Sequence, residues 1–283
     1  MNEIQVPALL ALAEEALPDA RRSPGAPYAL FDADGTLWAT DVANRLFTQL
    51  VAHRRLRASA LVPLNEARVR SGLPPADDDP TAAYVSLFQA YNAGQVDEQF
   101  MFATMVRALC DFELPELAAE HTRALGPEAA SPVAADLFPA MPTLFAGLRR
   151  LGYRLCVVSA SPLWTVRFAL AACGLVADEV RGAETQVEGE RLTSRPVEPM
   201  TYREGKLTVA RRDFGRDPTI AFGDGQGDVP FLAVSTVAVG INPRPALIRA
   251  AEGFLGRAVW LRCPVTQSGR PVEMPLVDES VED

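Results

Sequence analysis

Several residue types that build common functional sites are scarce in this chain of 283 residues. It has only two histidines, His53 and His121, which argues against a histidine-rich zinc site and against a serine–histidine triad. Its four cysteines are scattered and lack the paired spacing of a metal site. We therefore expect free thiols in a reducing compartment and predict a cytoplasmic protein.

Positive charge and long hydrophobic runs are also in short supply. The formal net charge is -9, which argues against nucleic acid or an anionic membrane as the main partner. No apolar stretch approaches the roughly 18 to 20 residues that span a bilayer. The N-terminal run "VPALLALA" lacks a preceding basic region and is flanked by Glu3 and Glu14, so we predict a short amphipathic helix rather than a signal peptide.

Lysine is the scarcest of the charged residues. Lys206 is the only one, so the other 26 of the 27 basic residues are arginines. The two cations differ where a compact, mobile point charge must meet a phosphate or carboxylate oxygen. A solitary lysine between two aspartate-rich segments therefore indicates a working residue rather than a solvated surface cation.

Strands and helices alternate in the second half of the chain and at one place in the first. A short apolar run at 28–31 reads as a buried strand, preceded by a polar linker over 18–27. From 143 onward the pattern is helix, strand, helix, strand, a hairpin turning at Glu188–Gly189, a helix around Lys206, and then further strands near 219–224, 236–241 and 258–262. This alternation predicts an α/β fold with a parallel sheet covered on both faces.

Residues 41–136 show a different pattern. Apolar residues recur there at three- and four-residue spacing, and no convincing strand interrupts them. We therefore predict a Rossmann-like core formed by 1–40 and 137–283, with an inserted α-helical cap domain at 41–136. The N-terminal helix and an acidic, proline-containing C-terminal tail are expected to be peripheral to this core.

Two carboxylates follow the first strand in "YALFDADGTLW". Asp32 and Asp34 are two residues apart, so in extended backbone they point to the same side. Two anions placed together are costly unless a cation or proton shares the site, and Mg²⁺ prefers one or two carboxylates with phosphate oxygens and waters. An aspartate–glycine turn that merely closes a strand is the alternative reading of this segment.

Polar groups follow two later strands as well. Ser159 in "VVSASP" precedes a helix start, where free backbone N–H groups bind anions, although simple capping of the helix by Ser161 is also compatible. Asp224 and Asp228 in "GDGQGD" offer a second pair of carboxylates on a glycine-rich loop. Ligands bind at the carboxyl ends of parallel strands, so we expect these segments to share one crevice with Lys206.

In this order the four segments resemble the motifs of the haloacid dehalogenase (HAD) superfamily of aspartyl-phosphate phosphatases. "DADGT" is similar to the first motif, Ser159 to the second, Lys206 to the third and "GDGQGD" to the fourth, and the resemblance covers about residues 28 to 243. Many members carry asparagine where this chain has Gly227. The resemblance implies the HAD fold, and the second aspartate, Asp34, favours phosphate esters over halide substrates.

The same resemblance implies a role for each motif residue. Asp32 is expected to be the nucleophile, and Asp34 the general acid and then base. Ser159, with the backbone of Ala160 beside it, is expected to hold a phosphate oxygen, and Lys206 to neutralise charge on the nucleophile and the phosphoryl group. The expected ligands of Mg²⁺ are Asp32, the carbonyl of Asp34 and Asp224, with Asp228 in the inner or outer shell.

Clues to the substrate are weaker. The helical insert takes the cap position of phosphoserine phosphatase and its phosphocholine-cleaving relatives. Asp41, seven residues after Asp34, has the spacing of a carboxylate that meets a substrate amine there, but a solvated aspartate at a helix start is the favoured reading. Trp38 is a candidate for cation–π contact with a quaternary ammonium, or for packing at the hinge of the cap. Arg45, Arg68 and Arg70 are undecided candidates for binding a carboxylate.

These observations predict a Mg²⁺-dependent phosphomonoester hydrolase that acts on a small phosphorylated metabolite, of the phosphoserine, phosphocholine or phosphoethanolamine type. A phosphotransferase using the same aspartyl-phosphate is one alternative, and a non-catalytic phosphate-binding regulatory protein is another. Neither the physiological substrate nor the oligomeric state follows from the sequence.

Overall fold

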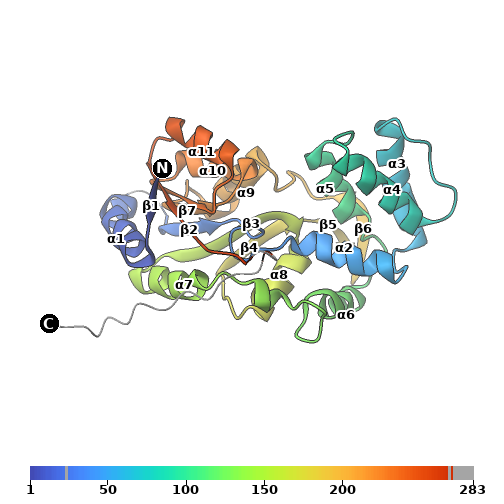
Figure 1. The fold of residues 1–283 in the computed structure, drawn as a ribbon, viewed down its shortest axis with the longest axis horizontal. Coiled ribbons are helices and arrows are strands. Elements are labelled where there is room, and N and C mark those ends of the chain that lie inside the picture. The colour runs from blue at the N-terminus through green and yellow to red at the C-terminus, as the bar shows by residue number, and fades with distance from the viewer. Residues whose placement is uncertain (23–24, 267–268, 270–283) are drawn as a thin grey trace.

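The computed structural model of the chain describes residues 1–22, 25–266 and 269. It is built on one seven-stranded sheet in which all neighbouring strands are parallel (Figure 1). The strands, in spatial order, are β1 (Asn2–Ile4), β9 (Arg257–Leu261), β8 (Val237–Ile241), β7 (Ile220–Gly223), β2 (Tyr28–Phe31), β3 (Arg154–Pro162) and β4 (Glu179–Ala183). The predicted α/β, Rossmann-like fold is confirmed.

Both faces of the sheet are covered by helices. The strand β2 shows why: its four side chains are fully buried, with Ala29 and Phe31 in one hydrophobic cluster and Tyr28 and Leu30 in another. Alternate residues of a strand face opposite sides, so a strand that is apolar throughout must be covered on both. The first face packs on α1 (Val6–Arg22), α7 (Ala140–Leu151) and α8 (Leu163–Ala172). The second packs on α9 (Glu204–Phe214), α10 (Val229–Val234) and α11 (Pro245–Ala250).

The segment between β2 and α7 is helical, as its periodicity predicts. Its helices lie together at one end of the molecule (Figure 1). They are α2 (Val42–Ala52), α3 (Leu61–Arg70), α4 (Pro80–Asn92), α5 (Glu98–Arg107) and α6 (Leu114–Leu125). Aspartates begin several of them: Asp41, Asp79 and Asp97 each accept a hydrogen bond from a backbone N–H of the first turn.

A two-stranded antiparallel hairpin, β5 (Thr185–Glu188) and β6 (Arg191–Pro196), turns at the predicted place. It lies beside the helical segment, where the N–H of Asp111 donates to the carbonyl of Leu192 at 2.8 Å and the N–H of Leu114 donates to the carbonyl of Glu190 at 2.9 Å. The hairpin follows β4 in sequence but packs on residues of the insert. The division into a core and a cap at residues 41 and 136 remains a prediction.

Some elements differ from those expected. The predicted linker over 18–27 is partly helical, because α1 continues through Pro18 to Arg22. The edge strand β1 and the short helices α10 and α11 were not predicted. Among the described residues, no helix is long and apolar enough to cross a membrane. Most of the predicted acidic tail, 267–268 and 270–283, lies outside the described residues.

Candidate active site

Three neighbouring strands bring the predicted segments to one end of the sheet. Asp32 follows β2, Ser159 lies in the irregular last part of β3, and Asp224 follows β7. Strands β3, β2 and β7 are adjacent and parallel, so these three side chains lie together at the carboxyl ends of the strands. All three line one cavity of about 400 Å³, together with Lys206 and Asp228. The expected crevice is therefore present.

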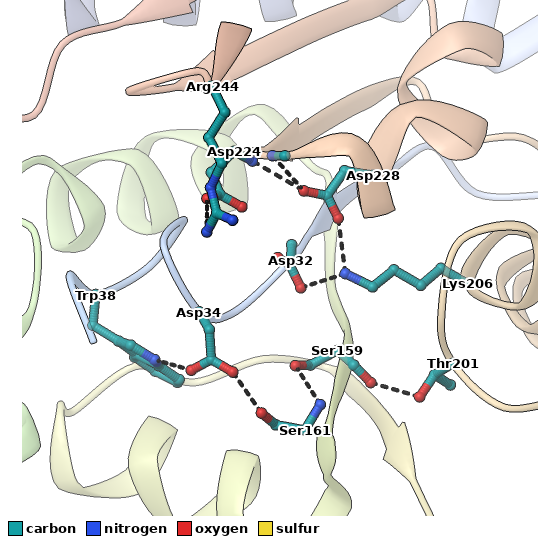
Figure 2. A network of polar contacts seen from close by, with 11 residues as sticks. Asp32, Asp34, Trp38, Ser159, Ser161, Thr201, Lys206, Asp224, Asp228 and Arg244 are labelled. Carbon is teal, nitrogen blue, oxygen red and sulfur yellow. Dashed lines mark hydrogen bonds and ion pairs between the residues drawn. The ribbon is translucent and has the colours of Figure 1, made fainter. Parts of the chain in front are cut away.

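Lys206 is enclosed by two carboxylates (Figure 2). Its Nζ donates to Oδ1 of Asp32 at 2.6 Å and to Oδ1 of Asp228 at 2.8 Å. All three residues are buried. Burial by itself would lower the pKa of Lys206, but the negative charges of Asp228 and Asp32 outweigh it and raise the pKa. The lysine is thus a fixed positive charge beside Asp32, not a surface cation.

Asp32 carries the opposite perturbation. Burial raises the pKa of its carboxyl well above the usual range, and the charge of Asp228 raises it further, while Lys206 opposes both effects. Its main-chain N–H donates to the carbonyl of Phe222 at 3.0 Å, which continues the pairing of β2 with β7 up to the site residue. Asp32 is held at the strand end and lines the cavity, and its second carboxylate oxygen has no hydrogen-bond partner in the part of the chain that the structure describes.

Asp34 is held separately from Asp32, by its own set of donors. Its Oδ1 accepts from Nε1 of Trp38 at 2.7 Å and from the N–H of Val42 at 3.0 Å, and its Oδ2 accepts from Oγ of Ser161 at 2.5 Å (Figure 2). Burial raises the pKa of this carboxyl, opposed by the bonds from Ser161 and Trp38. The carboxyl is therefore fixed in orientation while its proton is held more tightly than in water.

The fourth segment forms a tight acidic loop. Oδ2 of Asp228 accepts from the N–H groups of Asp224 and Gly225, at 3.0 and 3.1 Å, so this side chain closes the loop as well as bonding Lys206. Gly35 faces the loop with a positive φ of 76°, and a Cβ there would lie 2.5 Å from Oδ2 of Asp224. A side chain at 35 would clash with a site carboxylate, which is why glycine is required there.

Three carboxylates are placed to share a cation. One oxygen from each of Asp32, Asp224 and Asp228 lies within 4.8 Å of the others. Burial and the charge of Asp228 raise the pKa of Asp224 to about 6, which shows the cost of gathering these anions. An all-oxygen set of this kind suits a hard divalent cation such as Mg²⁺. The side chain of Asp34 is not in this set, and the expected role of its carbonyl stays a prediction.

Of the remaining predicted site residues, three line the cavity and one does not. Ser159, Ala160 and Asp41 line the cavity. Oγ of Ser159 accepts from the N–H of Ser161 at 3.1 Å, which leaves its hydroxyl hydrogen available to a ligand. Trp38 is fully buried and does not line the cavity, so the prediction that it meets a substrate cation is corrected: its indole N–H positions Asp34.

Ser161 was predicted at most as a helix cap, and that is wrong. The residue before α8 is Pro162, and the hydroxyl of Ser161 instead donates to Asp34. The register of β3 against β4 shifts between Val158 and Pro162, and this irregularity turns Ser161 toward the first motif. A periodicity argument has no signal for such a shift.

The arginine that reaches the cavity is not one of those considered from the sequence. Arg45 pairs with Asp136 at 2.6 Å, Arg68 bonds the carbonyl of Pro74 at 2.9 Å, and Arg70 lies over the ring of Phe100. Arg244 instead lines the cavity and pairs with Asp224, NH2 to Oδ2, at 2.8 Å. It follows β8, which adjoins β7, and that order of strands was not predicted.

The wall opposite the strand ends comes from the helical segment. Glu98 at the start of α5 accepts a hydrogen bond from the hydroxyl of Tyr202, and Phe102 of α5 meets the ring of Tyr202 edge-on at 5.7 Å. Tyr91 of α4 also lines the cavity. The cavity therefore lies between the sheet and the helical segment, with Tyr202, just before α9, as the contact between them.

Known proteins resemble this chain in sequence and in fold. Residues 29–233 match the family of haloacid dehalogenase-like hydrolases. The phosphoserine phosphatase SerB2 of Mycobacterium tuberculosis is 33% identical over 126 residues, 42% of this chain and 30% of that protein. The phosphoserine phosphatase of Halobacterium salinarum is 34% identical over 110 residues, 37% of this chain and 51% of that protein. The matched part thus spans a third to a half of these relatives.

A protein of unknown function from Bordetella pertussis has the same fold. Its TM-score is 0.63 at 20% identity, covering 83% of this chain and 98% of that one. The family match extends over well more than half of the residues and includes all four predicted motifs. The chain belongs to the family of haloacid dehalogenase-like hydrolases.

Proposed function

We propose that the protein is a Mg²⁺-dependent phosphomonoester hydrolase that acts on a small phosphorylated metabolite through an aspartyl-phosphate. The observation that carries the proposal is the separation of two carboxyls in one cavity. Asp32 is bonded to a buried lysine, while Asp34 is bonded to Trp38 and Ser161. Asp32 is placed to attack phosphorus, and Asp34 is placed to exchange a proton.

Asp32 is the nucleophile. An oxygen of its carboxylate bonds to phosphorus while the bond from phosphorus to the ester oxygen breaks, giving an acyl phosphate on Asp32 and a free alcohol. Lys206, 2.6 Å from the carboxylate, favours the ionised form of Asp32 and balances the charge of the phosphoryl oxygens. Asp228 holds that lysine in place from the other side.

Asp34 is the general acid and then the general base. It gives its proton to the departing ester oxygen, and it takes a proton from the water that later attacks the acyl phosphate, which returns Asp32 and releases inorganic phosphate. A carboxyl with a raised pKa suits both steps. Its three donors hold it in one orientation between them.

The transferred phosphoryl group is bound by Ser159, the backbone of Ala160 and Lys206, which share the cavity. The carbonyl of Ser159 accepts from the hydroxyl of Thr201 at 2.6 Å, which fixes this stretch next to the loop that precedes Lys206. When bound by Asp32, Asp224 and the carbonyl of Asp34, with Asp228 beside them, Mg²⁺ would offset negative charge on the phosphoryl oxygens.

Residues 41–136 act as a cap that closes over the substrate, and 1–40 with 137–283 form the core. Support comes from the cavity wall, which includes Asp41, Tyr91 and Glu98 of the helical segment. The two relatives named above are phosphoserine phosphatases. Phosphorylated amino acids and amino alcohols are therefore the leading substrate class, with Asp41 as a partner for an amine, and we place the enzyme in the cytoplasm.

The test is release of inorganic phosphate from phosphoserine, phosphocholine, phosphoethanolamine and sugar phosphates, with Mg²⁺ and with EDTA. The wild-type protein should release phosphate only with the metal. Asp32→Asn should abolish turnover while the fold is retained, because the amide is no nucleophile. Asp19→Asn, at an exposed carboxylate of α1, is the matched control.

Turnover of Asp32→Asn at the wild-type rate would refute the mechanism. Adding alcohols as acceptors separates the transferase alternative, in which phosphorylated product outruns free phosphate. Folded wild-type protein that binds phosphate and releases none from any ester would instead be the binding protein.

A further inference from the structure

Arg244 is the second positive charge of the cavity. Of the described residues that line it, only Lys206 and Arg244 are cations. Lys206 donates to Asp32 and Asp228, and in the proposed function it serves the phosphoryl group. Arg244 pairs with Asp224 through one terminal nitrogen, at 2.8 Å, and its other guanidinium nitrogens make no hydrogen bond to the described residues. Those donors remain available to a ligand.

The main chain of Arg244 is held by a hydrogen bond, while its guanidinium is exposed. Its main-chain N–H donates to the carbonyl of Asp224 at 2.9 Å, so its Cα is tied to the fourth motif. A Cβ at Gly225 would lie 3.8 Å from its Nε and 3.9 Å from its Cζ, which places the guanidinium over this glycine. The side chain is 67% exposed. It reaches down beside Asp224, toward the middle of the site (Figure 2).

Two carboxylates of the helical segment, those of Asp41 and Glu98, also line the cavity. The charge of Asp224 is the main cause that raises the pKa of Arg244, and Glu98 adds to the effect from the helical segment. Arg244 is therefore a lone cation that faces carboxylates of the cap side. Among the lining residues, Arg244 is the one cation outside the triad of Lys206, Asp32 and Asp228, and so the one that an anionic group on a leaving alcohol could meet.

We propose that Arg244 is a specificity-determining residue that binds a carboxylate on the leaving alcohol. The inference rests on the proposed phosphatase function and narrows its substrate class to phosphate esters of hydroxy acids and amino acids. A guanidinium presents a planar fork of donors that matches a carboxylate, and such charge-assisted bonds are the strong ones. The spare nitrogens make this contact while the pair with Asp224 is kept.

The experiment compares esters that differ in one group. Phosphoserine carries an amine and a carboxylate, phosphoethanolamine only the amine, phosphoglycolate only the carboxylate, and ethyl phosphate neither. Values of kcat/KM are measured for the wild type, for Arg244→Gln and for Arg244→Lys, which keeps the charge but loses the fork. Arg249→Gln, at an exposed arginine of the same helix, is the matched control.

The readout is the ratio between each carboxylate-bearing ester and its partner without the carboxylate. Loss of a charge-assisted hydrogen bond should lower both ratios about 10- to 100-fold in Arg244→Gln. Arg244→Lys should fall between it and the wild type, and Arg249→Gln should match the wild type. A merely structural role would lower all four rates together and leave the ratios alone.

Equal losses on all four esters would overturn the inference, as would a wild-type enzyme that does not prefer the carboxylate-bearing member of each pair. Either result leaves the phosphatase proposal standing, because phosphate is still released. Absence of metal-dependent release from every ester by the wild type would instead count against the proposed function itself.

Discussion

At the scale of single residues, the chain concentrates its unusual chemistry at one ion triad. Lys206, Asp32 and Asp228 are each buried to within a few per cent of full enclosure, with side-chain exposures of 4%, 9% and 2%. A buried charge whose partner is removed is strongly destabilising, whereas an intact and well-bonded set is not. Function and stability are therefore coupled at this lysine.

We expect Lys206→Met to abolish turnover and to lower the free energy of unfolding by about 3 to 5 kcal/mol at pH 7.5, measured with urea in EDTA. The folded-state pKa of Asp32 is already raised above its unfolded value and would rise further without the lysine. Ionised Asp32 thus penalises the folded state at high pH, and the penalty disappears as the pH falls and the carboxyl binds a proton.

The deficit of the variant should consequently shrink between pH 7.5 and pH 5.5. A deficit that is constant over this range would show that lost packing, not uncompensated charge, is responsible. Replacing the exposed Arg212 by Met is a suitable control, because that arginine pairs with Asp213 at the surface and surface pairs contribute about 0 to 1 kcal/mol.

The rarity of lysine made Lys206 visible in the sequence, and the position of Asp32 and Asp224 directly after predicted strands made these two visible. No comparable signal marks Ser161 or Arg244. Ser161 reaches Asp34 because β3 shifts its register, and Arg244 reaches the cavity because β8 lies next to β7. Trp38 was noticed for its ring, yet it acts through its N–H, and the sequence does not reveal which way an aromatic side chain faces.

At the scale of secondary-structure elements, Tyr202 is one of the residues that join the helical segment to the loop before α9, together with Met200, which packs on Val106 of α5. Tyr202 donates its hydroxyl to Glu98 of α5 and meets Phe102 with its ring. The next residue, Arg203, has a positive φ of 48°, and Gly205 and Lys206 follow at the start of α9. The position of Lys206 and this contact with the helical segment are thus linked through four residues of chain.

We expect Tyr202→Phe to loosen α5 selectively. The substitution keeps the ring contact but leaves the carboxylate of Glu98 without this donor, and hydrogen bonds to charged groups contribute about 1.5 to 3 kcal/mol. Amide hydrogen exchange in α5 should accelerate about 10- to 100-fold, and KM should rise more than kcat falls.

Tyr153→Phe is the control, since Tyr153 donates to the carbonyl of Ala13 in α1, which lies at the opposite end of the molecule from α5 (Figure 1). It should change exchange in α1 and leave α5 alone. Unaltered exchange of α5 in Tyr202→Phe would mean that the hydroxyl does not hold the segment.

Long periodic elements were predictable, and short ones were not. The apolar spacing predicted that 41–136 is helical, and α2 to α6 lie there, because each buries one face. The edge strand β1 has three residues, two of them exposed, so it carries no burial pattern to read. Helices α10 and α11 have six residues each, which is too short for an apolar periodicity to be read from the sequence. The hairpin β5–β6 was placed correctly, but its packing against the insert depends on long-range contacts.

At the scale of the whole molecule, the cluster of carboxylates makes stability depend on the cation. Burial and the charge of Asp228 raise the pKa of Asp224 to about 6. Near pH 8 the carboxylate of Asp224 is therefore ionised, and its negative charge destabilises the folded state. A ligand that binds only the folded state stabilises it by about 2.7 kcal/mol at 100 times its Kd.

We therefore expect saturating Mg²⁺ to raise Tm by about 5 °C at pH 8 relative to EDTA, measured by calorimetry at matched ionic strength. The rise should be smaller at pH 5.5, where Asp224 holds a proton that the metal must displace. Asp224→Asn should remove most of the rise and Asp19→Asn should keep it. An equal rise in both variants would place the cation elsewhere.

The distance along the chain between the partners of the ion triad has a consequence for biosynthesis. Asp32 and Lys206 are separated by 174 residues, and Asp228 comes 22 residues later still. At about 5 to 20 residues per second, a ribosome needs roughly ten to thirty-five seconds to pass from Asp32 to Lys206. Throughout that interval the nascent chain carries an acidic motif and a helical segment without the strand β7 that aligns them. The ion triad therefore forms only after translation past residue 228, and chains that stall earlier carry Asp32 without the two partners that the proposed mechanism requires.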